Sequence, residues 1–285
     1  MAGLYIHVPF CSKKCNYCNF FSLASKKFIA PYIQAVKKEI YLQKNYLNNE
    51  IIESIYFGGG TPSLLTINDL SLLLEEVYKN HNLAPDCEIT IEANPENLNK
   101  DYLKDLHKIG FNRLSIGIQS FFDDDLIYLD RIHNSKQAYT ALENAKTSDF
   151  RNISIDLIYG IPTLTDEMWI SNINKTLEFS ISHISAYCLT VENRTPLDFY
   201  IKNSKLPEPS EDAAIVQMEI LIDLLQKNNY IHYEISNFCK EGFFSKHNSN
   251  YWKQKNYLGL GPSAHSYNGI SRQWNISTKR RICLI

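Results

Sequence analysis

Three cysteines at short spacings are the residues of this chain best suited to chemistry. Cys11, Cys15 and Cys18 lie within eight residues, directly after a short apolar run that ends at Val8. Spacings of four and three residues place three thiolates on one tight loop. Three thiolates can hold three corners of a cubane iron–sulfur cluster and leave the fourth iron open. An open iron can bind a substrate or a cofactor.

Two other uses of these thiols remain open. A structural zinc ion takes four protein ligands, usually as two separated pairs, and no second pair of closely spaced cysteines follows in the sequence. His7 could supply a fourth ligand, although its position inside the preceding strand directs it away from the loop or into packing. Structural thiols without any metal are the third reading. The spacing favours the cluster over both alternatives.

Composition narrows the class of protein. The 285 residues are 44% hydrophobic, which is enough for a buried core, and 29 basic residues nearly balance 31 acidic ones. We therefore expect no nucleic-acid partner, because such proteins carry a basic surface. We find no apolar run of about 18 residues and no secretory signal, which predicts a cytoplasmic protein. The other four of the seven cysteines are scattered, as in a reducing compartment: Cys87, Cys188, Cys239 and Cys283.

The chain alternates predicted strands and helices. Strands are predicted at residues 3–8, 51–57, 88–93, 113–118, 152–158 and 184–189. Helices are predicted at residues 28–46, 67–79, 100–109, 166–179 and 212–227, with more than one across 123–147. Such alternation requires an α/β fold with a mainly parallel sheet. We predict a barrel-like core over residues 1–191, followed by an appended α/β region over residues 192–285.

Unusual residues follow the predicted strands, where parallel sheets gather their sites. Three glycines, Gly58 to Gly60, would let a ligand approach the backbone closely, and Thr61 adds a hydroxyl. Glu92 shares one face of its strand with Glu88 and Thr90, which indicates a polar barrel interior or rim, although Glu88 could simply be solvated.

Three further polar residues lie on or after the later strands. Gln119 follows the fourth strand and Asp156 lies in the fifth. Asp156 sits in an apolar strand, where an unpaired buried carboxylate would be costly, so we expect a functional partner for it. Arg131 is either a site residue or half of a surface ion pair with Asp130 or Asp124.

The cysteine triad after the first strand resembles that of the radical S-adenosylmethionine (SAM) superfamily. The resemblance implies a partial (β/α)6 barrel in which Cys11, Cys15 and Cys18 ligate a [4Fe–4S] cluster. Its open iron would chelate the amino and carboxylate groups of SAM. Reduction of the cluster would then permit SAM cleavage to a 5′-deoxyadenosyl radical, while the protein orients and shields the reaction.

The same resemblance assigns the rest of the SAM pocket. Gly59, Gly60 and Thr61 would lie nearest the methionine end, and Glu92 would accept hydrogen bonds from the ribose hydroxyls. Further SAM contacts are implied for one residue in the first strand, one inside the triad and three later polar positions: Tyr5, Tyr17, Gln119, Arg131 and Asp156.

Six motifs across residues 3 to about 276 resemble the family of oxygen-independent coproporphyrinogen III oxidase and its haem-chaperone relatives. They are YIHVPFC, YFGGGTPS, RLSIGIQSF, IDLIYGIP, HYEISNF and HNSNYW. The oxidase carries another cysteine two residues after the triad, where this chain has Phe20, and phenyl cannot replace a thiol. The resemblance therefore favours a haem chaperone that binds haem and transfers it to apo-proteins. The oxidase of porphyrin biosynthesis and a non-catalytic metal-binding scaffold are the alternatives.

Haem needs an apolar slot and usually an axial ligand. His247 is the candidate ligand that we prefer and His232 the second, with aromatic side chains able to flank a porphyrin at Tyr251, Trp252 and Tyr257. The resemblance implies apo-haemoprotein recipients, a reductant protein such as flavodoxin or ferredoxin, and a peripheral membrane association.

The end of the chain departs from the resembled family. Members normally continue into a small C-terminal domain, whereas this chain stops at Ile285, and its last residues, Ser277 to Ile285, match nothing that we recognise. We therefore expect a truncated C-terminal region, with a natural short form as the alternative.

Overall fold

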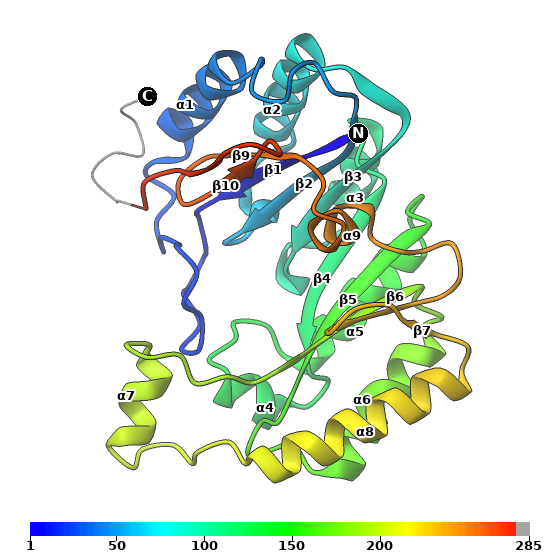
Figure 1. Ribbon diagram of the computed structural model, residues 1–285. Coiled ribbons are helices and arrows are strands. Elements are labelled where there is room, and N and C mark those ends of the chain that lie inside the picture. Colours follow the sequence, from blue (N-terminus) through cyan, green and yellow to red (C-terminus); the bar gives the residue numbers. More distant parts are fainter. Residues whose placement is uncertain (278–285) are drawn as a thin grey trace.

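The computed structural model describes residues 1–277, and residues 278–285 lie outside this description. The unmatched segment from Ser277 to Ile285, including Cys283, therefore falls almost wholly outside the described residues. One sheet runs through the molecule (Figure 1), in the strand order β11-β10-β9-β1-β2-β3-β4-β5-β6-β8-β7.

The central strands are β1 Ala2–Val8, β2 Ile52–Gly59, β3 Leu83–Ala93, β4 Arg113–Gln119, β5 Asn152–Tyr159 and β6 His183–Cys188. The outer strands are β7 Ile231–His232, β8 Asn237–Cys239, β9 Tyr257–Leu260, β10 His265–Tyr267 and β11 Arg272–Trp274. The longer helices are α1 Ile29–Leu42, α2 Ile67–Asn80, α3 Lys100–Lys108, α5 Ser135–Lys146, α6 Asp166–Glu178 and α8 Glu211–Lys227. The shorter ones are α4 Asp123–Tyr128, α7 Pro196–Lys202, α9 Lys246–Trp252 and the 3-10 turns η1 Pro62–Leu64 and η2 Pro95–Asn97.

The predicted alternation is confirmed. Strands β1 to β6 pair in parallel in chain order, and a helical crossover joins each strand to the next. Strand β3 begins at Leu83 rather than at the predicted Glu88, because its first residues pair with β2 across a register shift. That stretch contains Pro85, which argues against a strand when only the sequence is considered. Within residues 1–277 no pairing joins β11 to β7, so the sheet is a partial barrel.

Residues after 191 extend both edges of the central sheet. Strand β8 pairs antiparallel with β6, and β9 pairs parallel with β1. Both edges of the six-stranded core are therefore covered by strands that follow it in sequence, which protects edges that would otherwise expose unpaired backbone groups. The division of the chain at residue 191 stays a prediction.

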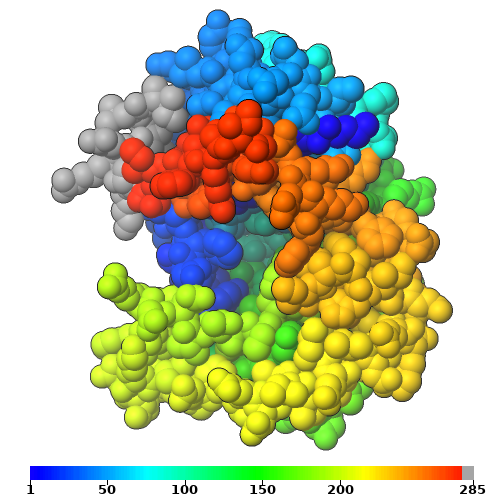
Figure 2. Space-filling model, in the orientation of Figure 1, coloured from blue at the N-terminus to red at the C-terminus, as the bar shows by residue number. Residues whose placement is uncertain are grey.

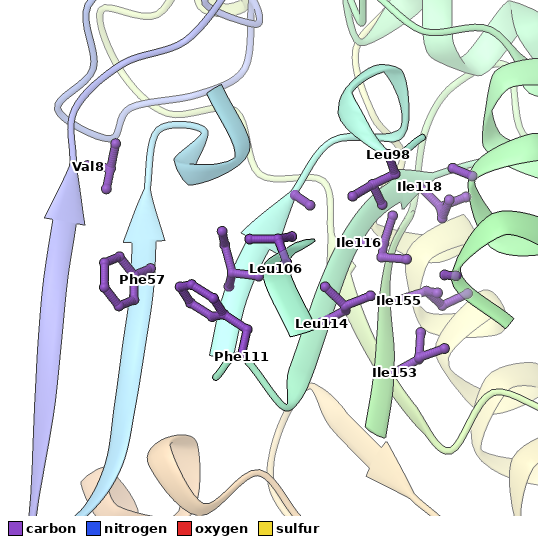
Figure 3. Close-up of a cluster of buried hydrophobic side chains, with 14 of the residues drawn as sticks. Val8, Phe57, Leu98, Leu106, Phe111, Leu114, Ile116, Ile118, Ile153 and Ile155 are labelled. Atoms are coloured by element: carbon purple, nitrogen blue, oxygen red, sulfur yellow. The ribbon is translucent and has the colours of Figure 1, made fainter. Parts of the chain in front are cut away.

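The two faces of the central strands differ in chemistry. Alternate residues pack against the helices and form the apolar core, as at Phe57 and Leu114, and Phe111 from the loop before β4 packs with them (Figure 3). The rings of Phe57 and Phe111 meet edge to face at 5.1 Å. The residues between them point into the barrel and are polar, as at Ser54 and Thr90, both fully buried. A polar interior lined by alternate residues can hold polar ligands at one end of the barrel.

Helix α9 packs against β1 and β2, and buried Glu88 caps it. The two carboxylate oxygens of Glu88 accept the backbone N–H groups of Lys246 and His247, at 3.1 and 3.2 Å. A carboxylate near a helix N-terminus is favourable because it satisfies amide groups that lack helical partners. The reading of Glu88 as a solvated residue is therefore wrong. No helix among residues 1–277 is both long and apolar enough to cross a membrane.

Candidate functional site

The cysteine loop connects β1 to α1, and backbone hydrogen bonds close its base. Cys11 N–H donates to Leu23 O at 3.0 Å, and Leu23 N–H donates to Pro9 O at 2.7 Å. Cys18 N–H donates to Cys15 O at 3.3 Å, which turns the loop back on itself. All three thiols are free and partly buried. The sequence therefore folds the triad into one compact loop at the carboxyl end of β1.

Neighbouring segments hold the cysteine loop in place. Arg131 Nη1 lies 3.6 Å from Cys15 Sγ, and Asn16 Nδ2 donates to Tyr128 O at 2.7 Å. From the other side, Leu197 N–H of α7 donates to Asn16 O at 2.9 Å. The loop is thus tied both to the segment after β4 and to α7, far away in sequence.

Arg131 is a residue of the site rather than half of a surface ion pair. Its Nη2 donates to Asn94 Oδ1 at 2.8 Å and to Gly117 O at 2.9 Å. Although burial opposes it, nearby Tyr17 and Cys15 raise the pKa of Arg131 further above its ordinary value. Asp130 pairs instead with Lys13. The alternative of an Arg131–Asp130 surface pair is wrong.

A pocket opens beside the three thiols. It has an empty volume of about 710 Å³, part of it open to solvent. Figure 2 shows a hollow in this face of the molecule, between the blue N-terminal residues and the yellow-green residues near 200. The structure brings eight of the nine predicted cofactor residues together there with the three cysteines: Tyr17, Gly59, Gly60, Thr61, Glu92, Gln119, Arg131 and Asp156.

Tyr5 is the predicted contact that does not line this pocket. Its ring lies beneath Gly58, where an added Cβ would come within 3.0 Å of it. Its hydroxyl lies 3.1 Å from His7 Nδ1, and His7 Nε2 lies 2.9 Å from Phe21 O. Both ring nitrogens of His7 are therefore occupied, so His7 cannot complete a metal site without leaving these partners. The role of Tyr5 as a SAM contact stays a prediction.

Sequence reasoning missed several residues of the pocket wall. Asn94 follows Glu92 past the end of β3, and Ser115 and Gly117 point inward from β4. The sequence pattern could have indicated each of them. Asn94 lies directly after β3, and Ser115 and Gly117 are alternate residues of β4. Lys13 and Lys14 also line the pocket from within the triad.

Glu92 is held by two donors. Tyr56 OH donates to Oε1 at 2.9 Å, and Gly59 N–H donates to Oε2 at 3.1 Å. Burial, and then the nearby Asp156, raise the pKa of Glu92 to about 7. Burial also raises the pKa of Asp156 to about 6, although Ser115 Oγ donates to its Oδ1 at 3.2 Å. Two carboxyl groups in one pocket therefore titrate near neutral pH.

Gln119 has the backbone geometry of a functional residue. Its φ is 65°, in the left-handed region that non-glycine residues rarely adopt, at a register shift between β4 and β5. Its side chain makes no hydrogen bond within residues 1–277, although the residue is only 8% exposed. Gln119 therefore lines the pocket in a backbone conformation that is uncommon for a non-glycine residue.

The thiols suit a multinuclear cluster better than one metal ion. Within residues 1–277 no three Cys, His, Asp or Glu side chains converge closely enough to hold a single ion. In a cubane each thiolate binds a different iron, so the three need not converge. Burial raises the pKa of Cys11 and Cys18, so these thiols stay protonated until a metal displaces their protons. The residues present therefore fit a [4Fe–4S] cluster.

The two candidate haem ligands lie away from this pocket. His247 is 3% exposed, and its Nδ1 and Nε2 lie 3.0 Å from Ser54 Oγ and Tyr251 OH. His232 is exposed, stacks on Phe238 and points Nε2 toward Ile235 O at 3.2 Å. Both ring nitrogens of His247 have partners, and the haem assignment of His247 stays a prediction.

Sequence comparisons place the chain in a family. The Radical SAM superfamily profile matches residues 5–175. Heme chaperone HemW of Mycobacterium tuberculosis is 34% identical over 278 residues, which cover 96% of this chain and 71% of that protein. Heme chaperone HemW of Lactococcus lactis is 39% identical over 264 residues, which cover 92% and 69%. The chain belongs to the HemW family of radical SAM proteins.

A solved structure agrees with the fold of this HemW-family chain. Coproporphyrinogen III oxidase (HemN) from Escherichia coli superimposes with a TM-score of 0.86 over 98% of this chain and 68% of that protein. At 24% sequence identity this match shows the fold alone, and it confirms the predicted radical SAM partial barrel. Radical SAM membership implies a [4Fe–4S] cluster and SAM.

Phe20 lies at the mouth of the site in this HemW-family chain. Its side chain is 64% exposed and borders both the cofactor pocket and a second pocket next to it. The second pocket has an empty volume of about 1140 Å³, part of it open to solvent, and its lining includes Tyr187 and Leu189. An exposed phenyl ring at this position adds apolar surface without a metal ligand.

Gly60 is expected to be essential to the packing of the cysteine loop. A Cβ at this position would lie 2.7 Å from Phe10 O, 2.9 Å from Val8 O and 3.0 Å from Cys11 Sγ. Two of these atoms belong to the backbone and cannot turn aside. We expect Gly60→Ala to destabilise the apo-protein by about 1–3 kcal/mol and to lower iron incorporation, as measured by urea unfolding and iron analysis after reconstitution.

Gly242→Ala is the matched control for this prediction. Gly242 has a positive φ of 84°, but an added Cβ would meet nothing within 4 Å. Its substitution costs about 1 kcal/mol of backbone strain and leaves the iron content unchanged. Equal iron content in the Gly60→Ala protein and the wild type would show that the loop does not need this close approach.

Proposed function

We propose that this chain carries a [4Fe–4S] cluster on Cys11, Cys15 and Cys18, binds SAM in the adjoining pocket, and serves as a haem chaperone that transfers haem to apo-proteins. The observation that carries the haem part is similarity across nearly the whole chain, at 34% and 39% identity, to two proteins named heme chaperones. The pocket residues carry the cofactor part.

The side chains around the pocket have different roles in binding the cofactors. When bound, the cluster and SAM supply one-electron chemistry that no side chain can provide. Glu92 is oriented by Tyr56 and Gly59 so that it can accept hydrogen bonds from the vicinal hydroxyls of a ribose. Gln119 offers an unpartnered amide, and Thr61, 4% exposed, lies at the foot of the cysteine loop. The chain therefore binds, orients and partly shields the cofactors.

The finer assignments also belong to this proposal. Apo-haemoproteins are the proposed recipients, and a flavodoxin or ferredoxin is the proposed reductant. Lys14 is exposed on the cysteine loop and donates to Phe20 O at 3.0 Å, which places a positive charge where an acidic electron carrier would approach. The cytoplasmic location and the peripheral membrane association stay predictions.

Haem binding and transfer can be tested on the reconstituted protein. After anaerobic loading with iron and sulfide, the protein is mixed with haem, desalted and followed by the Soret absorption. We expect haem to be retained and then to pass to an apo-peroxidase faster than free haem equilibrates, with the regain of peroxidase activity as the measurement. A parallel reaction supplies coproporphyrinogen III, SAM and a reductant.

The outcomes separate the competing functions. Haem retention and transfer without decarboxylation of coproporphyrinogen III supports the chaperone. Decarboxylation at a steady rate identifies an oxidase and overturns the proposal. Tight zinc binding without a brown chromophore identifies a metal-binding scaffold, and loss of all haem on desalting also contradicts the chaperone function.

A further inference from the structure

Three aromatic rings form a stacked layer inside the barrel, beneath the cofactor pocket. We use "stacked layer" for Tyr5, Tyr56 and His247. The ring centroids of Tyr56 and His247 lie 5.0 Å apart at 27°, and Tyr5 lies 6.1 Å from Tyr56 and 6.2 Å from His247. Tyr5 and Tyr56 are direct neighbours on the parallel strands β1 and β2. His247 comes from α9 and is the member of the layer that arrives from far away in sequence.

His247 is held firmly at this position. Ser54 Oγ and Tyr251 OH each lie 3.0 Å from one of its ring nitrogens, so a neutral ring donates to one hydroxyl and accepts from the other. Its backbone N–H donates to Glu88 at 3.2 Å. Burial and nearby Arg113 lower the pKa of His247 to about 3, which keeps the ring neutral. The ring is therefore fixed in orientation by three contacts.

The glycines of the barrel strands leave room for this layer. An added Cβ at Gly3 would lie 3.3 Å from the His247 ring and 3.2 Å from Ser54 Oγ. At Gly58 it would lie 2.9 Å from the Tyr56 ring and 3.0 Å from Glu92 Oε1. Gly3 in β1 therefore leaves space for the His247 ring, and Gly58 in β2 leaves space for the contact between Tyr56 and Glu92.

Hydrogen bonds connect the stacked layer to Glu92 and to the cysteine loop. Tyr56 OH donates to Glu92 Oε1 at 2.9 Å, which sets the orientation of that carboxylate. Tyr5 OH contacts His7 Nδ1, and His7 Nε2 contacts Phe21 O in the cysteine loop. Because a carbonyl oxygen only accepts, His7 carries its proton on Nε2 and Tyr5 donates to Nδ1. Both routes begin at rings that stack on His247.

We propose that His247 is a positioning residue of the cofactor pocket, which holds Tyr56 and Tyr5 in the orientation that presents Glu92 and the cysteine loop to SAM and the cluster. The inference rests on the SAM site of the proposed function. It gives the HNSNYW segment a role in cofactor binding and not in haem ligation, since both nitrogens of the ring already have partners.

The test compares SAM affinity, stability and haem retention in His247→Phe. Phenylalanine keeps an aromatic ring in the layer but loses both hydroxyl contacts. We expect SAM binding, measured by calorimetry on the reconstituted protein, to weaken about tenfold, while the Soret absorption of bound haem is kept. Tyr56→Phe, which removes the hydrogen bond to Glu92 directly, should weaken SAM binding by at least as much.

A double-mutant cycle separates positioning from a general loss of stability. If His247 acts through Tyr56 on Glu92, the His247→Phe change should weaken SAM binding much less in a Glu92→Gln background than in the wild type. A merely structural role would lower the melting temperature in both backgrounds and leave the SAM affinity alone. That result would overturn the inference.

Further variants keep the test decisive. His107→Phe on the exposed surface of α3 is the matched control and should change neither affinity. If His247→Phe does not fold, Tyr251→Phe is the second variant. It removes the hydroxyl that contacts His247 Nε2, at a residue that is 41% exposed. We expect a several-fold loss of SAM affinity. Unchanged SAM affinity in Tyr251→Phe, or loss of haem with intact SAM binding in His247→Phe, would contradict the positioning role. Absence of SAM binding by the wild type would instead refute the proposed function.

Discussion

Replacement of Cys15 by alanine should leave a folded protein that cannot hold its cluster. The three thiols line one pocket. A loop with two thiolates cannot retain a cubane that three thiolates hold. Iron after anaerobic reconstitution should fall from about four per chain to near zero, together with the brown colour, as measured by iron analysis and visible absorption.

Cys188→Ala is the matched control for this experiment. Cys188 lies in the second pocket, where its thiol is exposed and its Sγ makes only a long contact of 3.9 Å to Leu189 O. Its replacement should leave the iron content unchanged. Four irons retained by the Cys15→Ala protein, or equal losses in both variants, would refute the assignment of the triad.

The strands, the helices and most of the pocket could be predicted from local patterns. The apolar runs at Ile52–Gly59 and Arg113–Gln119 are short and bounded by turns, so each reads as a strand of a parallel sheet. In such a sheet the carboxyl ends meet at one edge, which brings Glu92, Gln119 and Asp156 to the cysteines without any knowledge of side-chain contacts.

The contacts that depend on long-range pairing could not be predicted in this way. Strand β9 pairs with β1 although Tyr257 and Gly3 lie at opposite ends of the chain, and its four residues carry little periodic signal. Helix α9 has seven residues, too few for a clear amphipathic pattern. Its His247 therefore looked like a free ligand, because nothing in the local sequence shows that Ser54 and Tyr251 occupy both nitrogens.

Tyr5 shows a second limit of local reading. The family resemblance implies a SAM contact for Tyr5, which stays a prediction, and the structure places its ring under Gly58 and its hydroxyl against His7. Alternation along β1 gives the face on which a side chain lies but not its depth in the barrel. That depth is decided by the rings stacked against Tyr5, which come from β2 and α9.

The protein should lose stability steeply as the pH falls below about 6.5, the ordinary pKa of histidine. Burial lowers the pKa of His247 to about 3, burial and nearby Arg131 lower that of His133 to about 3, and burial lowers that of His183 well below its ordinary value. Each stays neutral in the folded chain and binds a proton only on unfolding. The unfolded state then binds more protons, so the free energy of unfolding decreases as the pH falls toward 3.

The size of this effect is comparable with the stability of a typical domain. At about 1.4 kcal/mol for each pH unit below 6.5, three such histidines by themselves lower the free energy of unfolding by roughly 6 kcal/mol at pH 5, against a typical total of about 5–15 kcal/mol. The raised pKa values of Glu92 and Asp156 offset part of this loss. Chemical unfolding of the apo-protein at about pH 7.5, 6 and 5 measures the trend. A free energy of unfolding that stays constant over this range would contradict it.

The contribution of Glu92 to the pH dependence of stability has the opposite sign to that of the histidines, so its replacement should move acid unfolding to a higher pH. Its pKa of about 7 lies above the ordinary value, so the folded chain binds its proton more tightly than the unfolded chain does, and this contribution to stability grows as the pH falls from about 7 toward 4.5. Glu92→Gln removes that contribution, worth roughly 2 kcal/mol between pH 7 and pH 5. The variant should therefore unfold at a higher pH than the wild type. An acid midpoint that is unchanged or moves to lower pH in the variant would show that the pKa of Glu92 is not raised in the folded chain.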